Sequence, residues 1–140
     1  MLIAFASALV ALPQEAPRAE VAIVVARAVR QKFDDTEFNC PADFICMRYP
    51  ATGRFDQARV LDGIALPRRF TPRLWLHGRL RSIRFAMIVE RKPDGSLHIL
   101  DYRFIDRSGK VCFATESLRH FRLTLPGAQR DEAGDSCAQI

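Results

Sequence analysis

The stretch from Ser82 to Phe104 constrains the fold more than any other part of the sequence. In SIRFAMIVERKPDGSLHILDYRF, apolar and polar residues alternate on both sides of Lys92-Pro93-Asp94-Gly95. A period of two is typical of a strand with one buried face, and Pro followed closely by Gly favours a chain reversal. The stretch therefore predicts a β-hairpin. Its expected apolar face comprises Ile83, Phe85, Met87, Val89, Leu100, Tyr102 and Phe104, with Arg84, Glu90 and Lys92 facing the other way.

The rest of the chain adds further short elements. The run Val21 to Phe33 fits either one helical face or a strand, and its density of Val and Ile favours the strand. Residues 34 to 53 predict mostly loop, and 54 to 63 a strand that ends at the turn signal Asp62-Gly63.

Beyond the hairpin, Asp106 to Gly109 predicts a second reversal that extends it to a three-strand meander through Val111 to Phe113. A short helical turn capped by Thr115 and a last strand through Phe121, Leu123 and Leu125 would follow.

Short strands, frequent turn signals and little helix indicate an all-β fold with few short helical turns. We expect a small antiparallel β-barrel or sandwich, because 140 residues suit one domain and the composition is that of a globular protein. Over residues 21 to 125 the order of elements, a long first strand followed by twisted strands and a hairpin, resembles the oligonucleotide/oligosaccharide-binding (OB) barrel. The resemblance is one of architecture and rests on no diagnostic motif.

The N-terminal nineteen residues, MLIAFASALVALPQEAPRA, predict a secretory signal, because their apolar run is too short to span a bilayer. No basic residue precedes that run and no clean cleavage site follows it, so a strand or helix of the domain is the alternative. The expected organisation is thus a signal or apolar segment over 1–19, one β-barrel domain over 20–126 and a polar tail over 127–140.

The four cysteines favour the same compartment. An even number of cysteines in a small chain is typical of disulfides made in an oxidising environment. Spacing favours Cys40 with Cys46 and Cys112 with Cys137, although four cysteines allow three pairings. The polar tail has almost nothing to bury, so a bond at Cys137 would hold it in place. Zinc ligation and free cytosolic thiols are the alternatives, and the spacings fit a zinc site poorly.

A basic segment, RRFTPRLWLHGRLRSIR, lies between residues 68 and 84 and contains no acid. We call it the basic strip. It predicts a surface for an anionic partner, with these candidate residues: Arg68, Arg69, Arg73, Trp75, His77, Arg79, Arg81 and Arg84. The alternative, which we favour, is that these arginines pair across the sheet with Asp56, Asp62, Glu90 or Asp101. Arginine also accounts for 18 of the 21 basic residues of the whole chain, which weakens the functional interpretation.

No local catalytic or cofactor motif is present, so catalysis would need dispersed groups such as His77, His98 and His120 with Asp56, Asp62 or Asp101. The patch Asp34, Asp35 and Glu37 lacks the ligand spacing of a calcium loop and predicts a solvated turn. Tyr102, Phe104 and Phe113 could stack on bases but are expected to lie in the core.

Together these patterns predict a small secreted or periplasmic binding module without catalytic activity, cofactor, metal or transmembrane span. Its partner would be a protein or an anionic polymer at the cell envelope, attracted by a formal net charge of +5. A cytoplasmic nucleic-acid-binding barrel is the first alternative, and an enzyme with dispersed catalytic residues is the second.

Overall fold

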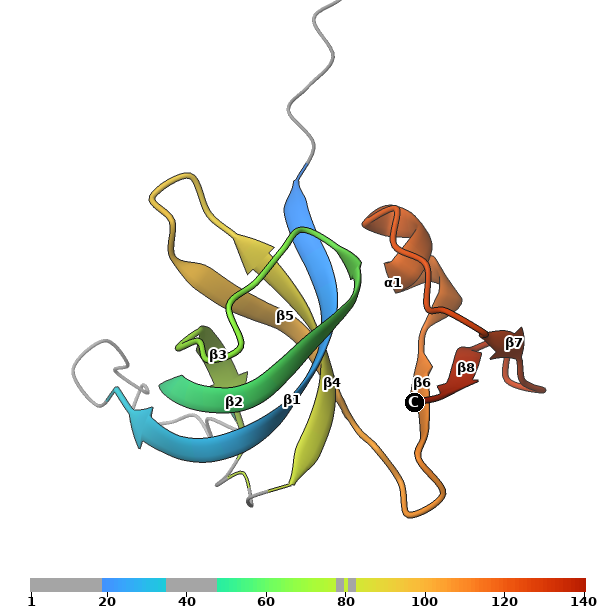
Figure 1. Cartoon of the computed structure of the whole chain (residues 1–140), viewed down its shortest axis with the longest axis horizontal. Coiled ribbons are helices and arrows are strands. Elements are labelled where there is room, and N and C mark those ends of the chain that lie inside the picture. The colour runs from blue at the N-terminus through green and yellow to red at the C-terminus, as the bar shows by residue number, and fades with distance from the viewer. Residues whose placement is uncertain (1–18, 35–47, 78–79, 81–82) are drawn as a thin grey trace, which may run out of the picture.

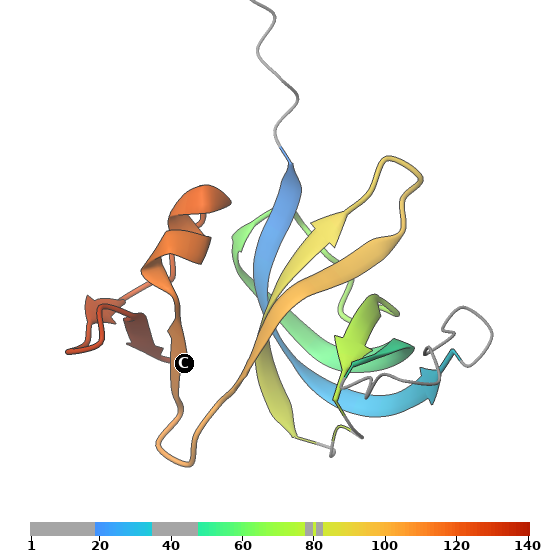
Figure 2. The same ribbon diagram turned by 180° about the vertical axis from the view of Figure 1, so that it is seen from behind.

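The computed structural model describes residues 19–34, 48–77, 80 and 83–140, and it confirms the predicted all-β fold (Figure 1). Five strands form a mixed sheet in a ring-like arrangement: β1 (Glu20–Phe33), β2 (Tyr49–Gly63), β3 (Arg73–Leu76), β4 (Arg84–Arg91) and β5 (Leu97–Phe104). The remaining elements form a C-terminal layer beside this ring: β6 (Lys110–Phe113), α1 (Thr115–His120), β7 (Gln129–Arg130) and β8 (Ser136–Gln139). Figure 2 shows from behind that the layer lies on one side of the ring.

The ring has the strand order β1-β2-β3-β5-β4, and β4 pairs back onto β1. Every pairing in it is antiparallel except that of β3 with β5, which is parallel and consists of the single bridge Arg73–His98. The strand preferred for Val21 to Phe33 is confirmed, and the strand expected over 54–63 begins earlier, at Tyr49. Register shifts along β1 bend it, since an extra residue on one strand kinks the pair.

The predicted β4–β5 hairpin is confirmed. The Gly95 N–H donates to the Lys92 carbonyl and the Asp94 carboxylate accepts from the Ser96 N–H, which fixes the turn. The expectation that β4 buries only one face is wrong, because Ala86 and Ile88 are as fully buried as the residues that alternate with them.

The ring encloses the first of two cores. Its buried residues are Val24, Ala26, Ala28, Ala51, Phe55, Phe70, Leu74, Leu76, Phe85, Met87, Val89 and Ile99. Phe55 stacks on Phe70 with ring centroids 5.5 Å apart. Tyr102 packs on this core as predicted, whereas Phe104, expected inside, is 61% exposed and covers the edge of Phe85.

The second core lies between the outer surface of the ring and the C-terminal layer. The ring contributes Val21, Ile23, Val25, Ala86 and Ile88, and the layer contributes Val111, Phe113, Leu118, Leu123, Leu125 and Ala138. This second contact explains why residues 21–26 are apolar without alternation: the first half of β1 is buried on both faces.

The C-terminal layer departs from the expected topology. The turn at Asp106–Gly109 and the short helix from Thr115 are confirmed, but β6 pairs with β8 instead of extending the hairpin to a meander. Thr115 does not cap the helix, since the N-cap is Ala114 and the Thr115 hydroxyl donates to the Gly134 carbonyl.

The chain beyond the helix differs as well. Leu123 and Leu125 are buried outside any strand, so the strand predicted there is wrong. The last strand is β8 in the expected tail, where Cys137 and Ala138 are buried, contrary to the expectation of almost nothing to bury.

A candidate binding face on strand β3

Strand β3 presents the exposed part of the basic strip. Leu74 and Leu76 point into the ring and are buried, whereas Arg73, Trp75 and His77 are exposed. This alternation follows the predicted pattern. Trp75 is 53% exposed although it is a large apolar ring and the sole tryptophan of the chain. An indole that projects outward from a strand offers a flat face on which a ligand ring can stack.

Two hollows flank Trp75 on the outside of the sheet. One, of about 260 Å³, lies among β2, β3 and β5 and is lined by Asp34, Pro50, Ala51, Thr52, Arg73, Leu74, Trp75, Lys92, His98, Ile99 and Leu100. The other, of about 300 Å³, is lined by Arg48, Trp75, His77, Ile99, Leu100, Asp101, Tyr102 and Arg103. Trp75, Ile99 and Leu100 are common to both, so they form an apolar ridge between the two hollows.

The position of Leu100 results from a β-bulge. Val89 pairs with Ile99 and Ile88 with Asp101, which leaves Leu100 as the extra residue of β5. Bulges reorient side chains, and Leu100 is 41% exposed beside β3 instead of buried in the ring. We define Trp75, Leu100, Arg73, His77 and the side chains lining these hollows as the tryptophan face.

The tryptophan face is mainly basic. Arg48 donates from Nε to Nε2 of His77 at 3.2 Å, and His98 contacts the Ser96 hydroxyl at 3.2 Å. Lys92 pairs with Glu90 at 2.6 Å and Arg103 pairs with Asp101 at 3.0 Å. These ion pairs are solvent-exposed and contribute little to stability, so their cations can still attract an anionic ligand.

The rest of the basic strip is distributed over other surfaces. Arg68 and Arg69 precede β3 and lie along β2, where the Arg68 carbonyl accepts from the Ala58 N–H. Arg84 lies on β4 opposite Arg27 of β1. Arg79 and Arg81 lie outside the described residues. The six described candidates therefore lie on β3 and its end, on the segment before β3 and on β4.

The acids expected to neutralise the strip are engaged elsewhere. Asp56 forms a two-point ion pair with Arg27 at 3.0 and 2.9 Å, while Glu90 and Asp101 pair with Lys92 and Arg103. Asp62 accepts from the backbone N–H groups of Gly63 and Thr124. The ion pairs of these acids therefore involve residues outside the strip, although the positive charge of Arg69 acts on Asp56. For Arg79 and Arg81, which lie outside the described residues, the pairing stays a prediction.

The ion pair of Asp56 and Arg27 changes the acidity of both groups. The hydrogen bond from Arg27 is the main cause that lowers the pKa of Asp56, and the nearby positive charges of Arg69 and Arg54 act in the same direction. The same hydrogen bond raises the pKa of Arg27. Both effects favour the charged forms, so this pair stays ionised at neutral pH.

The dispersed catalytic residues are not assembled. His77 and His98 are on the tryptophan face, but His120 lies at the end of α1 against Phe121, with ring centroids 4.7 Å apart. Within the described ranges, no hydrogen bond joins these histidines to Asp56, Asp62 or Asp101. His77 and Asp101 line the same hollow without a hydrogen bond between them.

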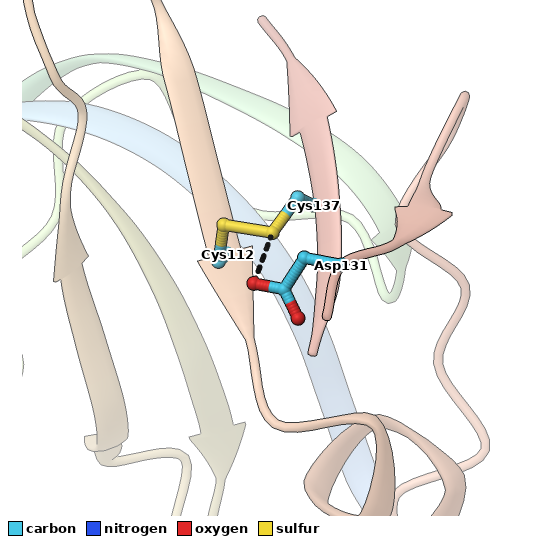
Figure 3. Close-up of side chains that lie close together, drawn as sticks. All are labelled: Cys112, Asp131 and Cys137. Carbon is cyan, nitrogen blue, oxygen red and sulfur yellow. Dashed lines mark hydrogen bonds between the residues drawn. A yellow bond between two sulfur atoms is a disulfide. The ribbon is translucent and has the colours of Figure 1, made fainter. Parts of the chain in front are cut away.

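The disulfide predicted between Cys112 and Cys137 is present. The two residues are directly opposite in the β6–β8 ladder, with Cα atoms 4.0 Å apart. Figure 3 shows the Asp131 carboxylate beside the Cys137 sulfur, at 3.5 Å. A disulfide sulfur carries no proton, so this approach is a contact and not a hydrogen bond. These three residues have the spacing of metal ligands, but the bond removes both thiolates.

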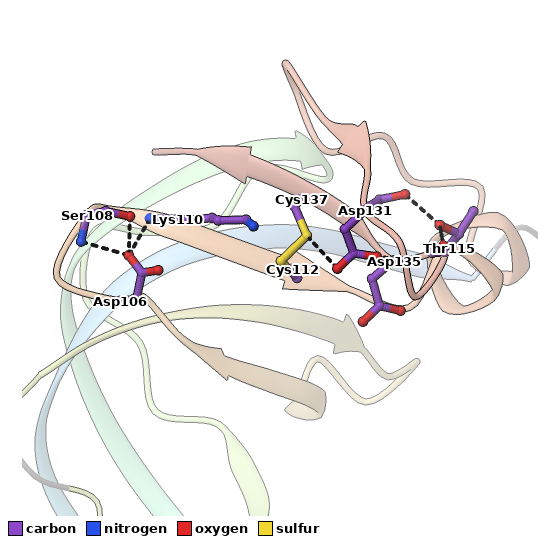
Figure 4. The surroundings of a disulfide bond; sticks show 10 residues. Asp106, Ser108, Lys110, Cys112, Thr115, Asp131, Asp135 and Cys137 are labelled. Carbon is purple, nitrogen blue, oxygen red and sulfur yellow. Dashed lines mark hydrogen bonds between the residues drawn. A yellow bond between two sulfur atoms is a disulfide. The ribbon is translucent and has the colours of Figure 1, made fainter.

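The surroundings of the disulfide are fixed by turns (Figure 4). Asp106 accepts hydrogen bonds from Ser108 and from the Lys110 N–H, and Asp131 accepts from the Asp135 N–H. The pairing predicted for Cys40 and Cys46 lies outside the described residues, as do Asp35 and Glu37 of the acidic patch.

Sequence reasoning missed His98, Leu100 and Arg48 as members of the tryptophan face. The parallel β3–β5 bridge brings His98 beside Arg73, and a bulge exposes Leu100; neither feature has a local sequence signal. Comparison with protein-family models, curated proteins and solved structures gave no match. Among the described residues, no helix is long and apolar enough to cross a membrane.

Proposed function

We propose that this protein is a non-catalytic binding module whose tryptophan face holds an anionic polymer. The observation that carries the proposal is the half-exposed Trp75, which stands between two hollows and is surrounded by basic side chains. A large aromatic ring costs free energy when it is left in water, and flat apolar rings beside cations are typical of sites that stack on sugars or bases.

The two kinds of side chain would have different tasks. Trp75 and Leu100 would contact rings of the polymer, and this contribution should depend little on salt. Arg48, Arg73 and Lys92 would contact phosphate or sulfate groups, and this contribution should weaken as salt rises, because binding releases counterions. Arg73 and Trp75 lie on one strand, which holds these two side chains at fixed spacing and limits the entropy lost on binding.

The architecture agrees with this proposal at a general level. Five strands closing into a ring resemble the OB barrel, which binds oligonucleotides and oligosaccharides. Because folds host many functions, the likeness supports a polymer ligand without choosing between a nucleic acid and an acidic glycan. A protein partner remains the other prediction from the sequence.

We also propose export to the cell envelope. The apolar run of residues 2–12 and the Cys112–Cys137 bond are the two supports. The intact mass of the protein from a periplasmic fraction tests it: export with cleavage predicts loss of the first 16 to 19 residues, counted on the sequence. A full-length cytosolic product with reduced thiols would contradict it and favour the cytoplasmic alternative.

The sole tryptophan makes the binding experiment direct. Titration of the protein with a heparin oligosaccharide, and separately with single-stranded DNA, should change the fluorescence of Trp75 for the polymer that binds. Preference for DNA would support the nucleic-acid alternative, and a response to neither would contradict the proposal.

Variants then assign the roles. Trp75→Ala should weaken binding about tenfold or more, the effect of removing one stacking contact. Arg73→Ala should reduce by about one the slope of the logarithm of the binding constant against the logarithm of the salt concentration. Arg107→Ala is the matched control, since Arg107 is also exposed but lies in the β5–β6 turn and does not line either hollow. Equal losses of binding for Arg73→Ala and Arg107→Ala would show that the net charge alone explains the effect.

A further inference from the structure

A second basic surface lies on the outside of β1, β2 and β4, and its arginines oppose one another. Arg30 of β1 is directly opposite Arg54 of β2, and Arg27 of β1 is directly opposite Arg84 of β4. Directly opposed residues of neighbouring strands project from the same face at close range, and like charges there repel. Two such pairs in one sheet make a feature that folding alone does not favour.

One acid partly offsets these four charges. Asp56 pairs with Arg27 across the β1–β2 ladder. Among the described residues, no ion pair engages Arg30, Arg54 or Arg84, and all three are exposed. Four arginines against one aspartate leave a local excess of three positive charges.

An aliphatic side chain lies among the arginines. Val29 is the extra residue between the pairs Ala28–Phe55 and Arg30–Arg54, so a β-bulge turns it outward, and it is 46% exposed. We define Arg27, Arg30, Arg54, Arg84 and Val29 as the arginine face.

We propose that the arginine face docks on a bilayer that carries anionic lipid headgroups. The charge complementarity of the four arginines would suit any polyanion. Val29 decides between partners, because an exposed valine gains free energy only where an apolar layer lies beneath the charges. Anionic bilayers provide that arrangement, and clusters of basic residues bind them electrostatically. A soluble nucleic acid or sulfated glycan has no such layer.

The arginine face adjoins the tryptophan face along β2. Thr52 of β2 is directly opposite Arg73 of β3, and Arg54 lies two residues further along β2. The other members of the arginine face lie beyond β2, on β1 and β4. The inference therefore depends on a different set of side chains from the proposed polymer ligand.

Vesicle sedimentation of the full chain tests the inference. We expect binding to vesicles of equal parts phosphatidylglycerol and phosphatidylcholine, weakening with salt, and no binding to pure phosphatidylcholine. The double variant Arg30→Ala/Arg54→Ala should bind roughly 30-fold less, the loss expected for two basic charges near an anionic surface. Because it relieves a like-charge pair, this variant should fold normally.

The control for charge is Arg107→Ala/Arg119→Ala, which removes two exposed arginines of the C-terminal part of the chain. It should bind the anionic vesicles almost as well as the unmodified protein. Equal losses for the two double variants would overturn the inference, since net charge would then explain the binding. Absence of binding to anionic vesicles by the unmodified protein would also overturn it.

Val29→Ser separates lipid docking from binding of a soluble polyanion. It should weaken vesicle binding several-fold and leave retention on heparin unchanged. If Arg30→Ala/Arg54→Ala loses heparin retention while Val29→Ser has no effect on vesicles, the arginine face is a polymer site and the lipid assignment fails. Trp75→Ala should leave vesicle binding intact, so failure of the proposed polymer function would be seen separately.

Discussion

The ring core is formed by strands that are far apart in the sequence, whereas the C-terminal layer is formed by a short segment folded on itself. The ring closes when β4 pairs with β1, which joins residues about 65 positions apart, such as Ala22 and Val89. In the layer, β6 and β8 pair over about 25 positions and are cross-linked by a disulfide. Closure removes exposed sheet edges, and a cross-link restricts the unfolded chain.

The two regions share one element, the first half of β1. Its residues alternate between the inner core and the outer core, so Val24 packs in the ring and Val25 under the layer. The comparison teaches that the layer is part of the fold and not an appended tail: it covers an apolar surface of the ring that would otherwise be exposed.

The largest expected effect is that of truncating one phenylalanine in each core. Phe85 and Phe113 are both fully buried, and Phe→Ala in a core costs about 3–5 kcal/mol. Phe85→Ala should lower protection against hydrogen exchange throughout the chain. Phe113→Ala should lower it mainly in β6 and β8. Equal loss of protection in ring and layer for both variants would show that the two unfold as one cooperative unit.

Removal of the disulfide should have the next largest effect. The bond spans 25 positions, for which loop entropy predicts a stabilisation of about 3 kcal/mol. Cys112→Ala/Cys137→Ala should lower the free energy of unfolding in urea by that amount. The circular-dichroism signal of the strands in the ring should be preserved. Loss of ring structure together with the layer would contradict the expectation that the closed ring keeps its structure without the disulfide.

A smaller effect is expected where a side chain ties ring and layer together. Asp62 of β2 accepts from the backbone N–H of Thr124, in the segment after α1. Asp62→Ala should cost about 1.5–3 kcal/mol, the range for a hydrogen bond to a charged group. Asp62→Asn is the control because it retains one acceptor oxygen, and it should cost less in thermal or urea unfolding. An equal cost for the two would assign the effect to the charge.

The smallest effect concerns pH and two similar turns, one in each region. The Ser96 hydrogen bonds lower the pKa of Asp94 in the β4–β5 turn, and the Ser108 side-chain hydrogen bond is the main cause that lowers the pKa of Asp106 in the turn before β6. A lowered pKa in the folded state means that each carboxylate stabilises its turn above the ordinary value of about 3.9. This contribution is lost as pH falls through the lower folded pKa.

NMR titration of the two carboxyl groups checks this prediction. Both should titrate below the range of an unfolded aspartate, and Asp106→Asn should remove the corresponding part of the acid dependence of stability. An ordinary pKa for Asp106 with a lowered one for Asp94 would indicate that only the ring turn is rigid.

Much of the ring was predictable from the sequence because its signals are local. The period of two in residues 83–104 and the Pro-Asp-Gly turn predict the β4–β5 hairpin without any long-range information. The alternation of Arg73, Trp75 and His77 with Leu74 and Leu76 likewise predicts which side chains of β3 are exposed. The pairing of Cys112 with Cys137 follows the spacing of the cysteines.

The two binding faces were less predictable because they combine residues of different strands. Arg84 belongs to the basic strip by sequence, but pairing of β4 with β1 places it opposite Arg27. Leu100 and Val29 have ordinary strand sequences around them, and only the bulges expose them. Acids that seemed available to the strip pair with residues nearer to them, as Asp101 does with Arg103.

The sequence by itself determined the strand content, the main turns and the inward or outward direction of side chains in β3, because backbone preference and side-chain period act over a few residues. Tertiary structure alone decided that the ring closes, that β6 joins β8 instead of β5, and that the start of β1 is buried on both faces. These features depend on which apolar surfaces pack against one another. Burial between segments that are distant in the sequence decides this packing, and a single sequence carries no local signal for it.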